Sequence, residues 1–563
     1  MATTTSNWGS GARLDYAHLE TGRDAFSKLT LSTTEAQIIG EEDLDLERQL
    51  FASRGSGAGD SLAALELSVT VEGPEQIVPC ARFKDSELHA TVLSNIQKCG
   101  YEKPTAIQAY CIPAVLSGKD IVAVAQTGSG KTAAYLCPIV SKLMGKVDQI
   151  GGPRADVTAT NYDPELHKVR AEPLVIIVCP TRELALQIYE ETRRIAYRSK
   201  LRAACAYGGI PIKYNLQQLG KGCDILIGTP GRLIDMLERP NVISLARVRF
   251  TVIDEADEML QDSEWEEALG KIMAGGDANE DADHRYLMFS ATFPKEARKL
   301  ARQYLQEDYV RIRVGRAGSS HRNVQQQIIW VDEDAKQTAL ADMLAATEPS
   351  LIIIFCNSVP GVERLDDFLF NKGYPTGFLH GRRSQFERED TMRAFFLRKH
   401  PILITTGLTA RGIDFAGVSL VVNYDLPSTE HGGIDEYIHR IGRTGRIGHV
   451  GKAVSFYNER NEGIGESLVN VLLETDQEVP DFLVQYKPDD GKAVFQDDSE
   501  EDDEAGVDNG GGGGWSGAAT DNGWGAEASQ TIEDVNASSD AHSGAGGGWN
   551  GVATNGTVED GAW

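Results

Sequence analysis

Short runs of aliphatic and β-branched residues alternate with amphipathic stretches along most of the chain. Five of these runs precede residue 315, at 123–128, 174–180, 224–230, 250–257 and 285–292. Continuous apolar runs of this length are typical of parallel strands that are buried on both faces. Because helix-like segments such as 181–200 lie between them, the pattern predicts an α/β domain with a doubly wound parallel sheet.

A second alternating block begins after Asn323. Its apolar runs lie at 325–331, 350–358, 375–381, 401–407, 419–427 and 452–459. The stretch 315–324 between the two blocks begins GRAGSSHRN, which is typical of a linker. We therefore expect two tandem α/β domains with parallel sheets, at 81–314 and 325–487, with functional residues at the carboxyl ends of their strands.

The two ends of the chain differ from the middle in composition. Residues 1–80 are acidic and rich in Ser, Thr and Gly, and residues 488–563 hold 17 acidic residues against Lys492 alone. Sequences with so little aliphatic content do not bury enough apolar surface to offset chain entropy. We expect a flexible N-terminal extension, a disordered C-terminal tail and, at 145–171, a surface insertion in the first domain.

Charge and cysteine content narrow the class of protein. The formal net charge is −28, but residues 81–487 carry only −4, so a nucleic-acid partner that binds a local basic stripe is not excluded. Eight scattered cysteines without a C-x-x-C pair predict buried, reduced thiols. No apolar run approaches the roughly 18 residues of a membrane span, and MATTTSNWGS has no secretory-signal pattern. These features predict a soluble intracellular protein without a membrane partner.

The stretch TVIDEADEML, residues 251–260, places four carboxylates directly after an apolar run. Like charges so close together repel one another unless a cation offsets them. Asp254 ends the run and is suited to bind Mg²⁺, and Glu255 is suited to orient or deprotonate an attacking water. Asp257 and Glu258 are either part of the same site or solvated charges at a helix start.

The segment AQTGSGKT, residues 125–132, has the pattern of a phosphate-binding loop. Gly128 and Gly130 let backbone N–H groups wrap around an anion, and Lys131 adds positive charge. Thr132 offers a hydroxyl to Mg²⁺. The segment follows a strand-like run and opens a helix-like one, as a P-loop requires, although Ala125 stands where the general motif has Gly.

The segment HRIGRTGR, residues 439–446, carries three arginines at three-residue intervals. One interpretation is a solvated basic helix face. The other is that Arg440 and Arg443 reach the nucleotide when the two domains close, so that hydrolysis depends on closure.

Together these segments resemble the motif set of the DEAD-box RNA helicases. The segments that carry the resemblance, between about residues 83 and 487, are AQTGSGKT (125–132), PTRELA (180–185), TPGR (229–232), DEAD (254–257), SAT (290–292), ARGID (410–414) and HRIGRTGR (439–446). Upstream, Phe83 and GYEKPTAIQ (100–108) resemble the adenine-reading Q motif of the family. The resemblance implies two RecA-like domains, ATP and Mg²⁺ as cofactors, and RNA unwinding or remodelling driven by ATP hydrolysis.

The resemblance also implies roles for individual residues. Phe83 is expected to stack on the adenine, Gln108 to hydrogen-bond it, and Thr105 to belong to the same nucleotide site. The phosphates are expected to bind the loop residues Ala125, Gln126, Thr127, Gly128, Ser129, Gly130 and Lys131, and Mg²⁺ to bind Thr132 and Asp254. Glu255 is implied to act on the catalytic water, Asp414 to contact the ribose, Arg440 to contact the γ-phosphate and Arg443 to be an arginine finger. Coupling of hydrolysis to unwinding is implied for Asp257, Ser290, Thr292 and His439.

RNA contacts are implied in both domains, at Pro180, Thr181, Arg182, Gly208, Gly209, Thr229, Arg232, Gly381, Gln385, Arg388 and Thr406. Helix N-termini, glycines and single Arg side chains bind phosphates without reading bases, so we expect RNA binding that is largely independent of sequence. For Arg388, in SQFERED, a surface ion pair three residues apart is the alternative.

The sequence departs from the family pattern at one position and resembles one subfamily in its flanks. Gly407, in TTGLT, stands where many members have Asp, which leaves the contacts of that carboxylate open. The insertion, the segment TDQEVPDFL (475–483) and the acidic or Gly-rich ends most resemble the Vasa-related cytoplasmic branch. That branch implies a monomeric core and a cytoplasmic location, with RNA granules and nuclear shuttling both left open.

Two questions remain open at the level of sequence. The tryptophans of the tail, Trp515, Trp524, Trp549 and Trp563, are either isolated residues of a disordered segment or anchors for a partner protein. The chain is expected to be a helicase, with a slowly hydrolysing RNA clamp as the alternative and a DNA translocase disfavoured by the motif set. Neither the RNA target nor the pathway follows from the sequence.

Overall fold

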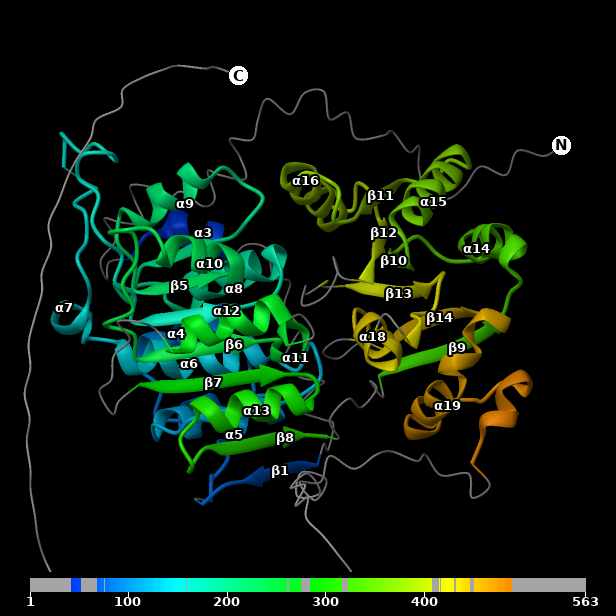
Figure 1. Ribbon diagram of the computed structural model, residues 1–563, viewed down its shortest axis with the longest axis horizontal. Helices are drawn as coiled ribbons and strands as arrows, with labels where there is room; N and C mark the ends of the chain where they lie inside the picture. The colour runs from blue at the N-terminus through cyan, green and yellow to red at the C-terminus, as the bar shows by residue number, and fades with distance from the viewer. Residues whose placement is uncertain are drawn as a thin grey trace, which may run out of the picture. The chain divides into compact units, whose positions relative to one another are not determined.

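The computed structural model describes residues 42–51, 68–74, 76–157, 159–260, 263–274, 284–315, 323–407, 415, 417–429, 432–445 and 450–488. These residues form two α/β domains, each built on its own sheet (Figure 1). The predicted tail, residues 488–563, lies outside the described residues except for Pro488, and so does most of the predicted linker.

The first domain contains a sheet in the order β1-β8-β2-β7-β6-β3-β5-β4, in which only β1 is antiparallel to its neighbour. Its strands are β1 (Val69–Glu72), β2 (Ile121–Val124), β3 (Val175–Val178), β4 (Ala203–Ala206), β5 (Ile225–Gly228), β6 (Phe250–Asp254), β7 (Arg285–Ser290) and β8 (Val310–Val314). Its helices are α3 (Leu44–Phe51), η2 (Phe83–Asp85), α4 (Ala90–Lys98), α5 (Ala106–Leu116), α6 (Lys131–Leu143), α7 (Val147–Ile150), α8 (Arg182–Ile195), α9 (Ile212–Leu219), α10 (Pro230–Leu237), α11 (Ala256–Met259), α12 (Ser263–Ala274) and α13 (Lys295–Tyr304).

The second domain contains a parallel sheet in the order β11-β12-β10-β13-β14-β9. Its strands are β9 (Val324–Trp330), β10 (Leu351–Cys356), β11 (Thr376–Leu379), β12 (Ile402–Thr406), β13 (Val418–Asn423) and β14 (Gly451–Tyr457). Its helices are η3 (Glu333–Ala335), α14 (Lys336–Ala345), α15 (Val359–Asn371), α16 (Gln385–Phe396), α18 (Gly433–Ile441), η5 (Glu459–Ile464), α19 (Gly465–Glu474) and η6 (Asp481–Tyr486).

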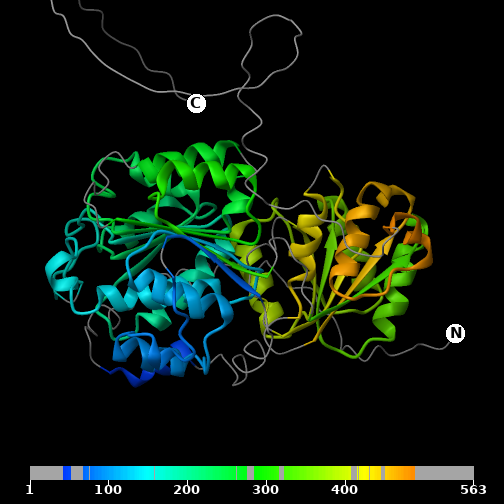
Figure 2. The ribbon, with the colours of Figure 1, turned by 90° about the horizontal axis from the view of Figure 1, so that it is seen from below.

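Helices cover both faces of each sheet (Figure 2), which is why the central strands are apolar throughout. In the first domain, α4, α5, α6 and α8 pack against one face, and α9 to α13 pack against the other. In the second domain, alternate residues of β10 separate the two cores: Ile352 and Ile354 face α14 and α15, whereas Ile353 faces α16. The predicted fold of two tandem α/β domains with parallel sheets is therefore confirmed.

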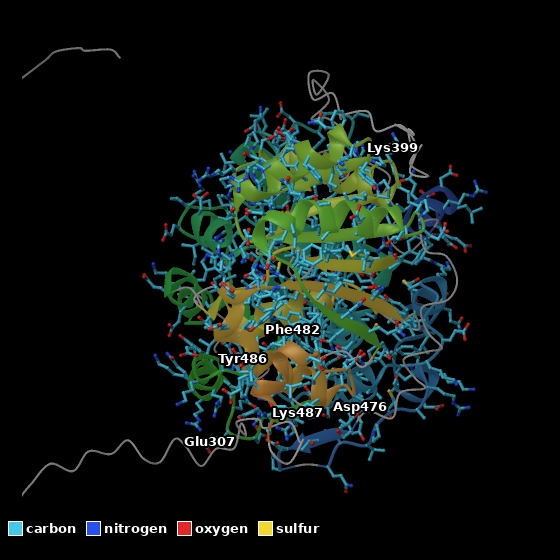
Figure 3. All side chains as sticks on the ribbon, turned by 90° about the vertical axis from the view of Figure 1, so that its right-hand side faces the viewer. Glu307, Lys399, Asp476, Phe482, Tyr486 and Lys487 are labelled. Atoms are coloured by element: carbon cyan, nitrogen blue, oxygen red, sulfur yellow. The ribbon has the colours of Figure 1, made fainter. Side chains whose placement is uncertain are left out.

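The C-terminal end of the second domain closes its core. Phe482 and Tyr486 of η6, both labelled in Figure 3, lie over the end of the sheet. The Phe482 ring lies 5.6 Å from those of Trp330 and Tyr457. The segment 475–483 thus belongs to the folded second domain.

Parts of the predicted flexible extension are ordered. In α3, Leu46 and Leu50 pack against Tyr197, and Glu47 pairs with Lys98 at 2.6 Å. The strand β1 pairs with β8 along its whole length. The acidic, Ser- and Gly-rich composition of residues 1–80 conceals these elements, because each is a few residues long and gains its stability from a distant part of the first domain.

The predicted surface insertion is tied to the first domain. Arg154 donates two hydrogen bonds of 2.8 Å to the buried carboxylate of Asp224, and the Val169 N–H donates to the Gly220 carbonyl at 2.8 Å. All eight cysteines are buried and unpaired, as predicted. Among the described residues there is no helix with the length and apolar character of a membrane span.

Candidate functional site

The loop between β2 and α6 has the backbone geometry of a phosphate cradle. Gly128 and Gly130 adopt left-handed conformations, with φ of 79° and 90°. A Cβ atom at Gly130 would overlap the side-chain amide of Gln108, which donates to the Gly130 carbonyl at 3.1 Å. Glycine is therefore required at this position by both the backbone and the space.

Lys131 opens α6 and lies inside the loop. Its ammonium group is buried and donates to the Ala125 carbonyl at 3.1 Å and to the Glu255 carboxylate at 3.3 Å. The hydroxyl of Ser129 is buried beside it and has no hydrogen-bond partner among the described residues. A buried cation next to an unsatisfied hydroxyl, at a helix N-terminus, is a donor set that suits phosphate oxygens.

Asp254 is the last residue of β6, and Glu255, which follows it, contacts the Lys131 ammonium. Tyr135 donates its hydroxyl to Asp254 at 2.9 Å, and the Glu255 N–H donates to the same carboxylate at 3.1 Å. Burial, and then the neighbouring charge of Glu255, raise the pKa of Asp254 to about 7 although Lys131 opposes them. Glu255 has a φ of 55°, which non-glycine residues rarely adopt, and such strain is concentrated at functional sites.

These residues fit a magnesium ion. The Tyr135 hydroxyl that donates to Asp254 also interacts with the Thr132 hydroxyl, so the two predicted ligands share one neighbour. Among the described residues no three His, Cys, Asp or Glu side chains cluster as a complete metal site. Mg²⁺ needs no such cluster, because it binds through one or two carboxylates together with substrate phosphates and water. Burial and the charge of Glu255 raise the pKa of Asp254, and a cation bound beside it would stabilise the ionised carboxylate.

Asp257 is the centre of a hydrogen-bond network. Its backbone N–H donates to the Ser290 hydroxyl at 3.1 Å, and its carboxylate accepts from the Thr292 N–H and hydroxyl at 2.9 and 2.8 Å. His439 of the second domain lies 3.9 Å from the same carboxylate. Burial raises the pKa of Asp257, but His439, Lys131 and these hydrogen bonds outweigh it and lower the pKa below its ordinary value.

The same network touches the phosphate loop, because the Ala125 N–H donates to the Ser290 carbonyl at 3.0 Å. The structure thus brings all four predicted coupling residues together. It contradicts one interpretation of the acid cluster: Glu258 is 8 % exposed and is not a solvated charge. The short helix α11 packs against the sheet, and Ala256 to Glu258 are all buried with it.

Of the predicted arginines of the second domain, Arg440 lies in the last turn of α18 and Arg443 in the turn that follows the helix. Arg440 donates to the Glu436 carboxylate at 2.8 Å, to the Asp425 carbonyl at 2.8 Å and to the Asn357 side chain at 3.0 Å. Arg443 is 1 % exposed and donates to the His439 carbonyl at 2.9 Å. Both are buried, so the interpretation as a solvated basic face is wrong for them. A polar cavity of about 600 Å³, lined in part by Asn357 and Asp425, adjoins this cluster.

The predicted RNA-contacting residues lie at strand ends and helix starts in both domains. Thr181 caps α8 by accepting from the Leu184 N–H at 3.3 Å, and Thr229 stands at the start of α10. Arg182 lies against Gly208 and Gly209, where a Cβ atom on Gly209 would overlap its guanidinium. Pro180 is buried, Arg232 and Thr406 are partly buried, and Gly381 is exposed.

Arg388 and Gln385 contact residues of the first domain. Arg388 lies 2.8 Å from the Glu183 carboxylate, with both side chains less than 10 % exposed. Gln385 accepts from Arg182 at 3.1 Å. The alternative of a surface ion pair three residues away is therefore wrong for Arg388, whose partner is more than 200 residues away in the chain.

Two of the Q-motif residues contact the phosphate loop or its neighbour. Gln108 accepts from the Thr105 N–H at 3.0 Å and contacts the phosphate loop, so both residues lie at the nucleotide site. Phe83 is 5 % exposed and packs in the core of the first domain. Asp414 and the rest of ARGID lie outside the described residues.

Sequence reasoning missed four residues that hold the site. They are Tyr135, Glu183, Asn357 and Glu436, which contact Asp254, Arg388 and Arg440. A signal existed for two of them, because Tyr135 lies four residues after Lys131 and Glu436 four residues before Arg440, on the same helix faces. Glu183 and Asn357 meet their partners only through the fold.

Comparison with known proteins agrees with this geometry. The family model described as DEAD/DEAH box helicase matches residues 105–300, and the one described as helicase conserved C-terminal domain matches residues 335–448. Dbp5 from S. cerevisiae, bound to RNA and ADP BeF3, is 26% identical with a TM-score of 0.58, and 71% of this chain and 95% of that chain are covered.

Two further solved structures are similar in sequence. Prp28 from Chaetomium thermophilum, bound to ADP, is 31% identical over 74% of this chain and 94% of that chain, with a TM-score of 0.37. A DEAD box protein from Methanococcus jannaschii is 33% identical over 71% of this chain and 99% of that chain, with a TM-score of 0.41. The two family matches together span more than half of the chain. They include the phosphate loop, the acid cluster, Arg440 and Arg443, so this chain belongs to the DEAD-box family of RNA helicases.

Proposed function

We propose that this chain hydrolyses ATP in response to RNA and uses the cycle to unwind short duplexes or remodel ribonucleoproteins. The observation that carries the proposal is the continuous network from the phosphate loop through Ser290 and Asp257 to His439. It links the nucleotide site of the first domain to α18 of the second domain, which bears Arg440 and is followed by Arg443. Binding of a nucleotide at the phosphate loop is thereby coupled to the position of α18 in the second domain.

In the proposed reaction, the backbone of residues 125–130 and the ammonium of Lys131 hold the phosphates. Asp254 and Thr132 hold Mg²⁺, which neutralises phosphate charge when it is bound. Glu255 orients the attacking water and accepts its proton. Because Glu255 and Lys131 are in contact, at 3.3 Å, Lys131 must exchange this carboxylate for phosphate when the nucleotide binds.

Several assignments are taken over from the family. We assign adenine stacking to Phe83, adenine hydrogen bonds to Gln108, ribose contact to Asp414 and the arginine finger to Arg443. The bound RNA and ADP BeF3 of Dbp5 support a shared RNA and nucleotide site across the two domains. RNA would cross the face formed by the N-termini of α8 and α10 and by the loops before α16.

Substituting Glu255→Gln tests the proposal. The amide of Gln has nearly the shape of the Glu carboxylate, so ATP should still bind. Because an amide does not accept a proton at neutral pH, RNA-stimulated turnover should fall by about a hundredfold or more. Binding is measured with a fluorescent ATP analogue and turnover by phosphate release. Intact turnover would show that Glu255 is not the base.

An RNA clamp that hydrolyses ATP slowly is a second candidate. The buried contacts of Glu183 with Arg388 and of Arg182 with Gln385 join the two domains and would favour a long-lived bound state. Strand displacement on a short RNA duplex separates the two candidates. A clamp would hydrolyse ATP and retain RNA without releasing the displaced strand.

The subfamily and the cellular setting are also proposals. We assign the chain to the Vasa-related branch and to the cytoplasm, supported by the composition of its acidic and Gly-rich ends. Imaging of a fluorescent fusion tests the location, and a predominantly nuclear signal would contradict it.

We also propose that the tail tryptophans bind a partner protein. Truncation after Lys487 should then remove specific proteins from pull-downs, and unchanged recovery would contradict it.

A further inference from the structure

Arg440 is held by the second domain itself. Three of its guanidinium nitrogens donate to three acceptors: the Glu436 carboxylate at 2.8 Å, the Asp425 carbonyl at 2.8 Å and the Asn357 side chain at 3.0 Å. The guanidinium also lies 5.3 Å from the centre of the Phe355 ring. Of the three acceptors only Glu436 is charged, so its hydrogen bond contributes most to the orientation of Arg440.

The carboxylate of Glu436 occupies the space beside Gly407. Gly407 follows β12 and is buried. A Cβ atom at this position would overlap the Glu436 carboxylate and would lie 3.1 Å from the Arg440 Nη2 atom. Glu436 is 2 % exposed, so the carboxylate has little room to move aside. Glycine at 407 and the hydrogen-bonded position of Glu436 therefore depend on each other.

We propose that Glu436 is the positioning residue for Arg440 in this chain, and that Gly407 makes the room in which its carboxylate lies. The proposal rests on the proposed function, in which Arg440 faces the γ-phosphate. With Glu436 removed, an aspartate at 407 would carry its carboxylate on a Cβ atom 3.1 Å from the Arg440 Nη2 atom, and so within reach of the same guanidinium. One of the two positions, but not both, supplies the acceptor for Arg440.

Removing the carboxylate should affect turnover more than binding of ATP. In Glu436→Ala, Arg440 retains two neutral acceptors and loses its charged one, so kcat for RNA-stimulated hydrolysis should fall about ten- to a hundredfold. KM for ATP should stay near that of the wild type, because the phosphate loop belongs to the first domain. Glu436→Gln retains an oxygen acceptor of the same length and should recover much of the loss.

An exchange of positions provides the sharper test. In the Glu436→Ala background, Gly407→Asp should restore kcat, because it returns a carboxylate to within reach of the Arg440 guanidinium. Gly407→Ala in that background fills the space without an acceptor and should restore nothing. Gly407→Asp alone places two carboxylates in one space and should lower kcat.

A second measurement does not depend on turnover. The Nε–H proton of Arg440 should exchange with solvent slowly in the wild type, faster in Glu436→Ala and slowly again in the exchanged variant, as seen by NMR of the Arg side chains. The proposal would be overturned if Glu436→Ala had the kcat and the Nε–H exchange rate of the wild type. It would also be overturned if, in the Glu436→Ala background, Gly407→Ala restored kcat as much as Gly407→Asp does. Absence of ATPase in the wild type would overturn the proposed function, while the exchange measurement would still decide on Glu436.

Discussion

Tyr135 is predicted to prepare Asp254 for Mg²⁺. Its hydroxyl donates to the Asp254 carboxylate at 2.9 Å, inside a core where both residues are buried. The same hydroxyl interacts with Thr132, the other predicted ligand. Tyr135→Phe removes only this hydroxyl and leaves the ring, which packs against Phe289 with 5.0 Å between ring centres. The substitution therefore changes the orientation of the carboxylate with little effect on the packing of the core.

The size of the effect follows from the kind of hydrogen bond that is lost. A hydrogen bond to a charged group contributes about 1.5–3 kcal/mol. The carboxylate has to be ionised to bind the cation, so this energy is lost from Mg²⁺-dependent nucleotide binding. At about 1.4 kcal/mol for each tenfold change, the affinity should fall roughly ten- to a hundredfold. Binding of the nucleotide without Mg²⁺ should not change, because the phosphate loop is untouched.

The assay is a titration with a fluorescent ATP analogue, once with Mg²⁺ and once with a chelator. Tyr189→Phe is a matched control, since Tyr189 is also buried in the first domain and its hydroxyl has no hydrogen-bond partner among the described residues. It should bind Mg²⁺ and nucleotide like the wild type. Equal affinities of Tyr135→Phe and the wild type in Mg²⁺ would refute the role of Tyr135, and equal losses in both variants would point to general damage to the core.

Two further predictions concern residues outside the reacting centre. Arg154→Met removes the ion-pair partner of the buried Asp224 carboxylate and leaves it the hydrogen bond from the Arg202 N–H at 2.6 Å, so the first domain should lose up to about 3 kcal/mol in denaturant unfolding, whereas the double substitution with Asp224→Asn should recover much of this energy. An unchanged unfolding midpoint in Arg154→Met would contradict the structure. Gly209→Ala meets both a left-handed φ of 79° and the guanidinium of Arg182, so it should cost about 1–2 kcal/mol and weaken RNA binding. Gly208→Ala, whose Cβ atom would lie 3.5 Å from Arg182, is the control and should bind RNA more tightly than Gly209→Ala.

The sequence was sufficient to identify the central strands that are apolar along their whole length. Apolar runs such as VIIV and LIIIFC are long enough to identify buried parallel strands, and both are strands in the structure. The strand β4 was missed because its sequence, AACA, has little β-propensity and is held by its neighbour β5. The strand β8 was missed because VRIRV alternates apolar and charged residues. Tertiary pairing decides both cases.

The candidate site was predicted where chemistry and local spacing agree. Lys131, Asp254 and Asp257 lie within a short stretch of a motif, and the fold brings them together as expected. The burial of charged side chains was harder to predict than which residues belong to the site. Glu258 looks like a solvated charge in the sequence, yet it is buried because α11 turns back onto the sheet. Glu183 likewise owes its burial to residues that lie far away in the chain.

Both domains contain a buried ion pair that the sequence motifs alone do not reveal. In the first domain the cation Lys131 pairs with Glu255, and in the second the cation Arg440 pairs with Glu436. Lys131 and Arg440 are thus each paired with a carboxylate of their own domain, and both pairs are buried. At Lys131 the phosphates must displace the carboxylate of Glu255, whereas at Arg440 the carboxylate of Glu436 stays in place and orients the guanidinium. If Arg440 contacts the γ-phosphate as proposed, ATP reaches cations of both domains and its hydrolysis product reaches only that of the first, which gives a physical reason for the closed state to depend on ATP.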